Sequence, residues 1–224
     1  MGVDSIRVWG LACALVASAV GTTSADEPAA ESGLLPGPVR VRLALGANVH
    51  GACCRRGNDG FAQLSALGLT APHIFGHAAG ELDVRLGPHV RLGVSGGVSW
   101  RSAGREEGTR GVAPRDIQST WRYGYAESYT AIGVGRRYGS LRLETGGRLS
   151  VGGGWTTWTI DSEAASAPIV RASAAFEVAL LVRGRGAALR AGYALVRSGS
   201  MGPADLYFDY SHVFVDVGAV VAFP

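Results

Sequence analysis

The sequence contains no lysine, so the 21 residues counted as Lys or Arg are all arginine. A phosphate-binding loop of the Walker type and Schiff-base chemistry are therefore excluded, because both need a lysine amine. Charged residues make up only 17% of the chain, less than in an ordinary globular domain. The arginines are interspersed with Asp and Glu rather than clustered, so the net charge of +3 does not indicate nucleic-acid binding.

Long hydrophobic runs are also missing after the first residues of the chain. Arg7 precedes a short apolar run over residues 8–20, and Thr23, Ser24 and Ala25 supply the small residues of a cleavage site. Residues 1–25 are therefore predicted to be a secretory signal peptide rather than a membrane-spanning helix. No later run is long enough to span a bilayer as a helix. An exported chain of this kind can still span a membrane as a closed β-barrel.

Glycine is abundant, at 34 residues, and is spread through segments that alternate apolar and polar residues. Such alternation has the period of a β-strand. Residues 26–37 are predicted to be a periplasmic lead-in and residues 38–224 to be the barrel domain. Eight strands are predicted, near residues 39–50, 73–86, 89–101, 121–135, 141–158, 168–182, 187–197 and 207–223.

The predicted connections alternate between short and long. Short turns are expected around residues 87–88, at 136–140 and at 183–186, while the longest loops are expected at 51–72 and 102–120. Short turns at one end and long loops at the other are typical of outer-membrane barrels. An even number of strands then places both ends of the domain on the short-turn side, the periplasm.

Each predicted strand has one apolar face and one polar face. We expect the apolar face to contact lipid, because the interior of an eight-stranded barrel is only wide enough to be filled by side chains. Charges of both signs can pair in that interior, away from lipid. The charge network predicted for the lumen consists of Arg40, Arg42, Glu81, Asp83, Arg85, Arg91, Glu127, Arg142, Glu144, Arg148, Arg171, Glu177, Arg190 and Asp216.

In this pattern, residues 38–224 resemble the small outer-membrane barrels of the OmpA and OmpX type. The resemblance implies an all-β fold, an eight-stranded antiparallel up-and-down transmembrane β-barrel in the bacterial outer membrane, with no catalytic residues and no cofactor. The last strand also resembles the assembly signal of that class, although Pro224 follows the aromatic Phe223 where the usual form ends on the aromatic. The implied partners are outer-membrane lipid and the barrel assembly machinery; the sequence identifies no ligand of the outer loops.

Histidines and cysteines are expected near one another at the outer rim of the barrel. Imidazole and thiolate groups together suit zinc or copper. The alternative is that the histidines fill a polar lumen and the two loop cysteines carry ordinary thiols. The candidate ligands are His50, Cys53, Cys54, His73, His77 and His212.

Several functions stay open at this point. A structural or surface-interaction barrel with a filled polar lumen is the favoured interpretation, and a narrow pore is its variant. A soluble, lipocalin-like periplasmic binder would need the apolar face turned inward. A lipid-modifying enzyme would need a nucleophile and a base together, but Ser211 and His212 are adjacent on a strand and face opposite sides. The chain is therefore predicted not to be an enzyme.

One group of aromatic residues is predicted to lie outside the barrel. Trp121, Tyr123, Tyr125 and Tyr129 fall in the fourth predicted strand. Aromatic residues form girdles at both interfaces of an outer-membrane barrel. We therefore interpret these four residues as part of such a girdle.

Overall fold

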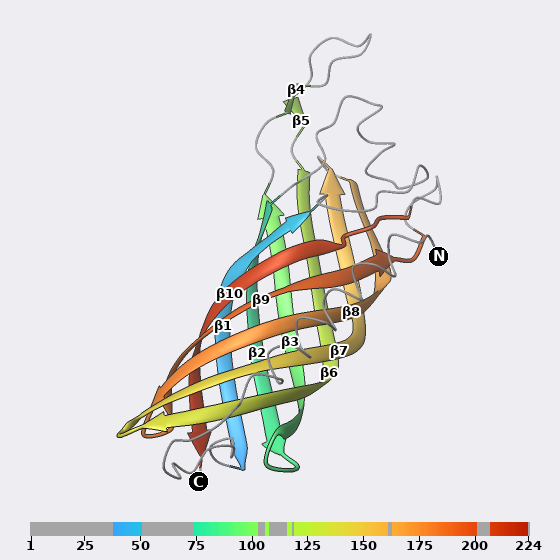
Figure 1. Ribbon diagram of the computed structural model, residues 1–224. Coiled ribbons are helices and arrows are strands. Elements are labelled where there is room, and N and C mark those ends of the chain that lie inside the picture. Colours follow the sequence, from blue (N-terminus) through green and yellow to red (C-terminus); the bar gives the residue numbers. More distant parts are fainter. Residues whose placement is uncertain are drawn as a thin grey trace, which may run out of the picture.

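Segments that alternate apolar and polar residues form long strands in the computed structural model (Figure 1). The structure describes residues 38–50, 74–102, 106–107, 116–117, 119–160, 163–200 and 207–223. No helix in these ranges is long and apolar enough to cross a bilayer. The strands are β1 (Val39–His50), β2 (Ile74–Arg85), β3 (Val90–Ser102), β4 (Glu106–Glu107), β5 (Asp116–Ile117), β6 (Ser119–Tyr138), β7 (Leu141–Ile160), β8 (Glu163–Val182), β9 (Arg185–Ser198) and β10 (His212–Phe223).

Eight of these strands close into an antiparallel barrel. The order around the barrel is β1-β10-β9-β8-β7-β6-β3-β2, so every barrel strand pairs with its neighbour in the sequence, and β10 returns to β1. The closing pair runs from Val39 opposite Phe223 to His50 opposite His212. The predicted eight-stranded up-and-down barrel is therefore confirmed, and with it the architectural likeness to barrels of the OmpA and OmpX type.

Some predicted boundaries are wrong at the long-loop end of the barrel. β7 continues to Ile160 and β8 begins at Glu163. Only residues 161–162 therefore connect the two strands, where a longer loop was expected. Pro168 lies within β8, one residue before Ile169, which is the first β8 residue that pairs with β9, so β8 has a ladder on only one side there. An edge position of this kind tolerates proline.

Two further differences concern the loops at the same end. β10 begins at His212 rather than near residue 207, because residues 207–211 form only an isolated bridge with β9, between Arg197 and Asp209. Inside the long connection between β3 and β6, β4 pairs with β5. Two residues on each side are too few to leave a periodic signal in the sequence.

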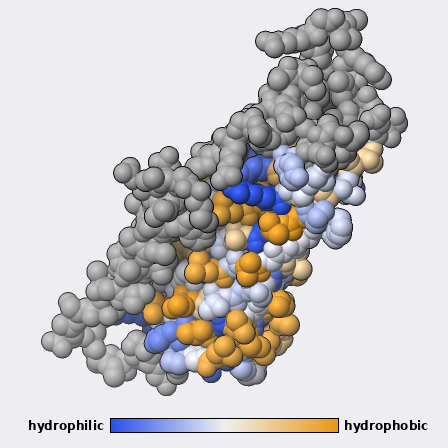
Figure 2. Space-filling view, turned by 90° about the vertical axis from the view of Figure 1, so that its right-hand side faces the viewer, coloured by the Kyte–Doolittle hydropathy of each residue, from blue (hydrophilic) through white to orange (hydrophobic). Residues whose placement is uncertain are grey.

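The outer face of the barrel is apolar and the inner face is charged. Large apolar side chains are exposed on every barrel strand, for example Leu45 at 68% on β1 and Val94 at 57% on β3. Apolar side chains gather over much of the described surface seen in Figure 2. A soluble barrel has the reverse arrangement, with apolar residues inside. This inverted distribution is that of a transmembrane barrel with its outer face in lipid.

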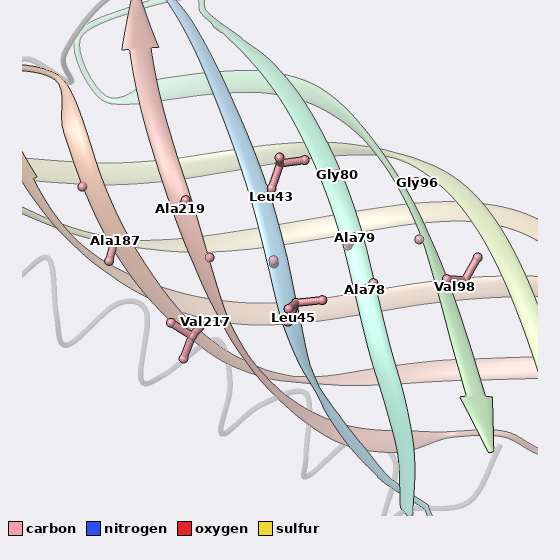
Figure 3. A pocket seen from close by; sticks show the side chains of 14 residues that line it. Leu43, Leu45, Ala78, Ala79, Gly80, Gly96, Val98, Ala187, Val217 and Ala219 are labelled. Carbon is pink, nitrogen blue, oxygen red and sulfur yellow. The ribbon is translucent and has the colours of Figure 1, made fainter. Parts of the chain in front are cut away.

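The lipid face has a shallow depression where small residues replace large ones (Figure 3). Ala78, Gly80 and Gly96 line it on β2 and β3, and the longer side chains of Leu43 and Leu45 project beside it from β1. Lipid chains fill such an uneven surface without a specific contact. We assign no function to this depression.

Replacing Val94 with arginine tests the lipid-facing assignment. Val94 lies two residues from the midpoint of β3, opposite Leu82 of β2, and points outward. We expect V94R to lower the free energy of unfolding in lipid vesicles by about 2–4 kcal/mol, the cost of a basic residue at the middle of a bilayer. Urea titration followed by tryptophan fluorescence measures it, with Val94→Leu as the control that changes little. An equal, small effect of both variants would contradict lipid contact at this position.

Candidate functional site

The candidate site is the lumen, where charged side chains from all eight barrel strands are buried. The inward positions follow from the pleat: once one residue of a strand points inward, every second residue does. The structure places most of the predicted network at less than a tenth exposed. These buried residues are Arg40, Arg42, Glu81, Asp83, Arg91, Glu127, Glu144, Arg148, Arg171, Arg190 and Asp216.

Three predicted members lie nearer the rim and are half-buried: Arg85, Arg142 and Glu177. Arg85 ends β2, and its backbone N–H donates to the carbonyl of Pro38 at 2.8 Å. Arg142 lies near the short-turn end, where its Nε is 3.1 Å from Glu144 Oε1. Glu177 reaches further inward and contacts Arg40 Nη1 at 2.8 Å.

Glu81 is the centre of the network. Three arginines from three other strands converge on its carboxylate: Arg42 at 3.3 Å, Arg148 at 2.9 Å, and Arg190. The Glu81 side chain is only 1% exposed. Arg42 and Arg190 also contact Asp216, so that two carboxylates and three guanidinium groups form one cluster across the lumen. Charges this deeply buried need such partners, because unpaired they would be strongly destabilising.

Two further carboxylates extend the network in both directions. Towards the short-turn end, Asp83 accepts hydrogen bonds from Arg40 at 2.9 Å, Arg91 at 2.7 Å and the hydroxyl of Tyr129 at 2.8 Å. The Asp83 carboxylate thus accepts hydrogen bonds from two guanidinium groups and one hydroxyl group.

Towards the long-loop end, the second carboxylate, Glu127, accepts from Arg148 at 2.7 Å and also contacts Arg171. The hydroxyl groups of Ser95 and Ser150 donate to it as well, both at 2.9 Å. This carboxylate is therefore satisfied by two cations and two hydroxyl groups.

The predicted aromatic girdle on β6 is wrong, because its residues point into the lumen. Trp121, Tyr123 and Tyr129 are each 2% exposed, and Tyr125 is 7% exposed. They have the same parity along β6 as Glu127, which the prediction itself placed inside. The Arg148 guanidinium lies 3.6 Å from the centre of the Tyr129 ring and that of Arg171 lies 4.2 Å from the Tyr125 ring. The tyrosines thus form cation–π contacts with the network instead of meeting lipid.

Above the charge network, aromatic rings fill the long-loop end of the lumen. Trp121 stacks on Trp158 with ring centres 5.2 Å apart, and Phe208 packs edge-on against Trp121 at 5.3 Å. The Tyr210 ring centre lies 5.8 Å from that of Tyr123, and the Tyr210 hydroxyl oxygen accepts a hydrogen bond from Thr156 Oγ1 at 2.9 Å. This layer, which we call the aromatic layer, is made of Phe75, Trp121, Tyr123, Trp158, Phe208 and Tyr210.

Phe208 and Tyr210 reach the lumen although they lie outside the barrel strands. The backbone N–H of Ser198 donates to the carbonyl of Phe208 at 3.0 Å, and that of Tyr210 donates to the carbonyl of Val196 at 2.8 Å. Both aromatic side chains are almost fully buried, at 1% and 0%. Pairing with β9 therefore holds the segment 207–211 so that alternate residues close the upper lumen.

Glycine on the inner face makes room for aromatic rings in the lumen. Gly97, beside the Tyr125 ring, gives a testable case. A Cβ atom at Gly97 would lie 2.7 Å from Tyr125 Cζ and 2.8 Å from the carbonyl oxygen of Ala78. We expect Gly97→Ala to lower the free energy of unfolding by about 1–3 kcal/mol through overpacking. The neighbouring Gly96 faces outward, and a Cβ there meets only Tyr125 O, at 3.5 Å. Gly96→Ala is the matched control, and equal losses in urea titrations of the two variants would contradict this packing.

The histidines predicted as metal ligands are only partly brought together. His50 and His212 lie on paired strands with ring centres 4.8 Å apart, whereas His77 Nε2 is 2.8 Å from the Tyr125 hydroxyl oxygen. Cys53, Cys54 and His73 lie outside the described residues. Within the described ranges, no group of three or more His, Cys, Asp or Glu side chains has metal-binding geometry. The metal site stays a prediction.

Ser211 and His212, considered as a nucleophile and base, have separate partners. The backbone N–H of Val196 donates to Ser211 Oγ at 3.2 Å. His212 Nδ1 lies 2.7 Å from the carbonyl oxygen of Tyr210, and its Nε2 is 3.4 Å from the Tyr123 hydroxyl oxygen. Both side chains are buried, and each is held by its own partners rather than by the other.

Sequence reasoning missed the uncharged residues that complete the lumen. The Asn48 side-chain amide donates to Ser99 Oγ at 2.7 Å and to the Tyr123 hydroxyl at 3.0 Å. Ser150 and Ser173 hydroxyl groups lie 2.5 Å apart beside Glu127. Strand parity was the signal that could have found them, because each shares a face with a charged residue already placed inside.

Comparison with known proteins gives structural likeness only. No protein-family model matches the chain, and no curated protein matches it. Neisserial surface protein A (NspA) has a similar structure, with a TM-score of 0.45 and 12% identity, over 84% of this chain and 98% of that one. Ail, the attachment invasion locus protein of Yersinia pestis, gives a TM-score of 0.37 and 12% identity, over 84% and 98%. Ail in complex with the heparin analogue sucrose octasulfate gives 0.40 and 11%, over 83% and 99%.

Proposed function

We propose that this chain is a bacterial outer-membrane barrel with a closed lumen, which acts in a structural or surface-interaction role through its long-loop end. The inverted distribution of side chains carries the proposal: Leu45 and Val94 are exposed outside, while Arg42 and Glu81 are buried inside. A soluble lipocalin-like binder would need the opposite arrangement. Export by the predicted signal peptide agrees with this location.

The closed lumen is supported by two successive layers of side chains. The cluster around Glu81 and Asp216 spans the barrel, and the aromatic layer lies between it and the long loops. An ion crossing the lumen would have to separate buried ion pairs and displace stacked rings. A pore is therefore disfavoured.

Separate experiments test the outer-membrane location of the protein and the closure of its lumen. In cell fractionation the protein is expected in the outer membrane, resistant to urea extraction, with a gel mobility that changes on boiling. Recovery in the soluble periplasm without a heat-dependent shift would refute the location. In planar bilayers the purified protein is expected to give no unitary conductance. Steady current steps from folded protein would refute closure and favour the pore.

We further propose that β10 is the segment recognised by the barrel assembly machinery. Val213, Val215 and Val217 alternate outward along it, and Phe223 near its end is 48% exposed. Phe223→Ala is expected to reduce the amount of folded barrel in the outer membrane several-fold. Phe176→Ala, which removes a lipid-facing aromatic of similar exposure from β8, is the control. Equal yields for the two variants would argue against a terminal assembly signal.

A further inference from the structure

Four arginines are exposed at the short-turn end of the barrel: Arg136 and Arg137 near the end of β6, and Arg183 and Arg185 around the turn between β8 and β9. We call them the turn arginines. The two turns are neighbours, because Leu141 at the start of β7 pairs with Val182 at the end of β8. Figure 1 shows both turns together at the lower left of the barrel.

The described strand segments that form these two turns carry arginine without acidic residues. Residues 134–143 and 178–189 contain no Asp or Glu. The acidic residues that border these stretches, Glu144 and Glu177, point into the lumen and contact Arg40 there. Among the described residues, Arg137, Arg183 and Arg185 take part in no ion pair.

The turn arginines lie at the boundary of the apolar outer face. Val134, Leu180 and Val182 are exposed on the strand segments leading to the two turns, at 43%, 51% and 49%. Tyr138 is 53% exposed, and the Arg136 guanidinium lies 5.6 Å from its ring centre. Tyrosine is enriched where hydrocarbon gives way to headgroups. In the proposed membrane location, this boundary is where lipid headgroups are expected.

The backbone of the β8–β9 turn provides a second, independent observation. Arg183 has φ of 51° and Gly184 has φ of 80°, a conformation that favours glycine or asparagine at both positions. Arg183 is the one non-glycine residue with positive φ in the described chain. Gly184 is also fixed from the side, since its carbonyl accepts a hydrogen bond from the N–H of Ala222 at 2.7 Å. An arginine at a position unfavourable for its backbone indicates that the side chain has a use.

We infer that the turn arginines bind the phosphate headgroups of anionic phospholipid in the adjacent leaflet. This inference rests on the proposed membrane location. Guanidinium groups pair with phosphate oxygens through two parallel hydrogen bonds. Basic residues placed beside a membrane surface attract anionic lipid. A rigid pair of turns that presents such groups just beyond an apolar belt fits a lipid phosphate better than a soluble anion.

The test compares wild type with the variant R136Q/R137Q/R183N/R185Q. Asn at 183 keeps a residue that tolerates positive φ, so the turn is preserved while its charge is lost. The matched control, R136K/R137K/R183K/R185K, keeps the charge. Each is reconstituted in phosphatidylcholine vesicles containing spin-labelled phosphatidylglycerol or spin-labelled phosphatidylcholine, and electron spin resonance measures the protein-bound fraction of each lipid.

Wild type is expected to prefer phosphatidylglycerol by about fivefold or more, as one basic residue near a charged surface already contributes about that factor. The lysine variant should keep most of this preference and the neutral variant should lose it. Salt at about 0.5 M should weaken it, since the contacts lie at the surface. Equal preference in wild type and the neutral variant, or none in wild type, would overturn the inference.

Two further results distinguish lipid binding by the turn arginines from a free-phosphate site and from a failure of membrane insertion. Sodium phosphate that abolishes the preference, when sodium chloride of equal ionic strength does not, would indicate a site for free phosphate and overturn lipid docking. Heat-dependent gel mobility of the same vesicles reports insertion. A wild type that fails to insert refutes the proposed membrane location, whereas an inserted wild type that binds both lipids equally refutes only the role of the turn arginines.

Discussion

Replacing Glu81 with glutamine is expected to lower the free energy of unfolding by about 3–5 kcal/mol. That is the typical cost of removing one partner from a buried ion pair. The change keeps the size of the side chain but leaves Arg42, Arg148 and Arg190 facing a neutral group in the buried centre of the lumen. Asp216 still balances Arg42 and Arg190, whereas among the described residues Glu127 is then the one carboxylate paired with Arg148.

The measurement is urea-induced unfolding of the protein in phosphatidylcholine vesicles, followed by tryptophan fluorescence. Asp209→Asn is the matched control, because the Asp209 carboxylate lies 4.0 Å from Arg197, whose side chain is 52% exposed. Asparagine can still accept the hydrogen bond that Asp209 Oδ1 accepts from the Ser211 N–H at 2.9 Å, and Arg197 is open to water, so we expect a cost of about 1 kcal/mol or less. If E81Q unfolds at the same urea concentration as the control, the Glu81 cluster does not stabilise the barrel.

Truncation of Phe208 to alanine is expected to cost about 3–5 kcal/mol, the usual range for a buried phenylalanine. The ring is 1% exposed and packs against Trp121 and Trp158 with ring centres 5.3 and 5.7 Å away. Its loss leaves a cavity beside two stacked indoles. The near-ultraviolet circular dichroism of these tryptophans is therefore expected to weaken together with the stability.

The neighbouring Tyr207 offers a control at the adjacent position. It is 56% exposed, so Tyr207→Ala removes an aromatic ring of similar size from the outside of the same segment. Its effect on the unfolding midpoint is expected to be small. Similar losses for the two variants would mean that segment 207–211 does not insert Phe208 into the lumen in the membrane.

The strands were predictable because the side-chain period of a β-strand does not depend on its surroundings. On β10, Val213, Val215 and Val217 alternate with inward residues over the whole strand, and the expected register of faces agrees with the structure. The ends of β7 and β8 were less predictable. The first residues of β8 are mostly small and leave no clear alternation, and the last residues of β7 are held extended by pairing with both β6 and β8.

The error on β6 has a different cause. Trp121 and Tyr123 were assigned to an outer girdle from residue type, although Glu127 on the same strand was assigned to the lumen from its charge. A strict period of two requires all three residues to share a face. Strand parity is therefore a better guide to the facing of a tyrosine than its preference for membrane interfaces.

The pairing of charges inside the lumen depends on the closed barrel. Arg40 and Glu177 are separated by 137 positions in the sequence and lie on β1 and β8, which are not neighbours in the sheet. Their contact is set by the radius and the stagger of the barrel together. The sequence indicates which charges share a face, whereas the partner of each arginine requires the three-dimensional structure.

In the membrane, the apolar outer face is expected to contact lipid while the charges are enclosed. Spin labels placed one at a time at Leu45, Val94 and Val217, in a Cys53→Ser/Cys54→Ser background, test this arrangement. These positions lie on three strands and are 68%, 57% and 58% exposed. In vesicles, each label is expected to collide more often with oxygen than with a water-soluble nickel chelate, and a label at Arg183 should show the reverse. Labels at the first three positions that meet the nickel chelate more often than oxygen would contradict the account.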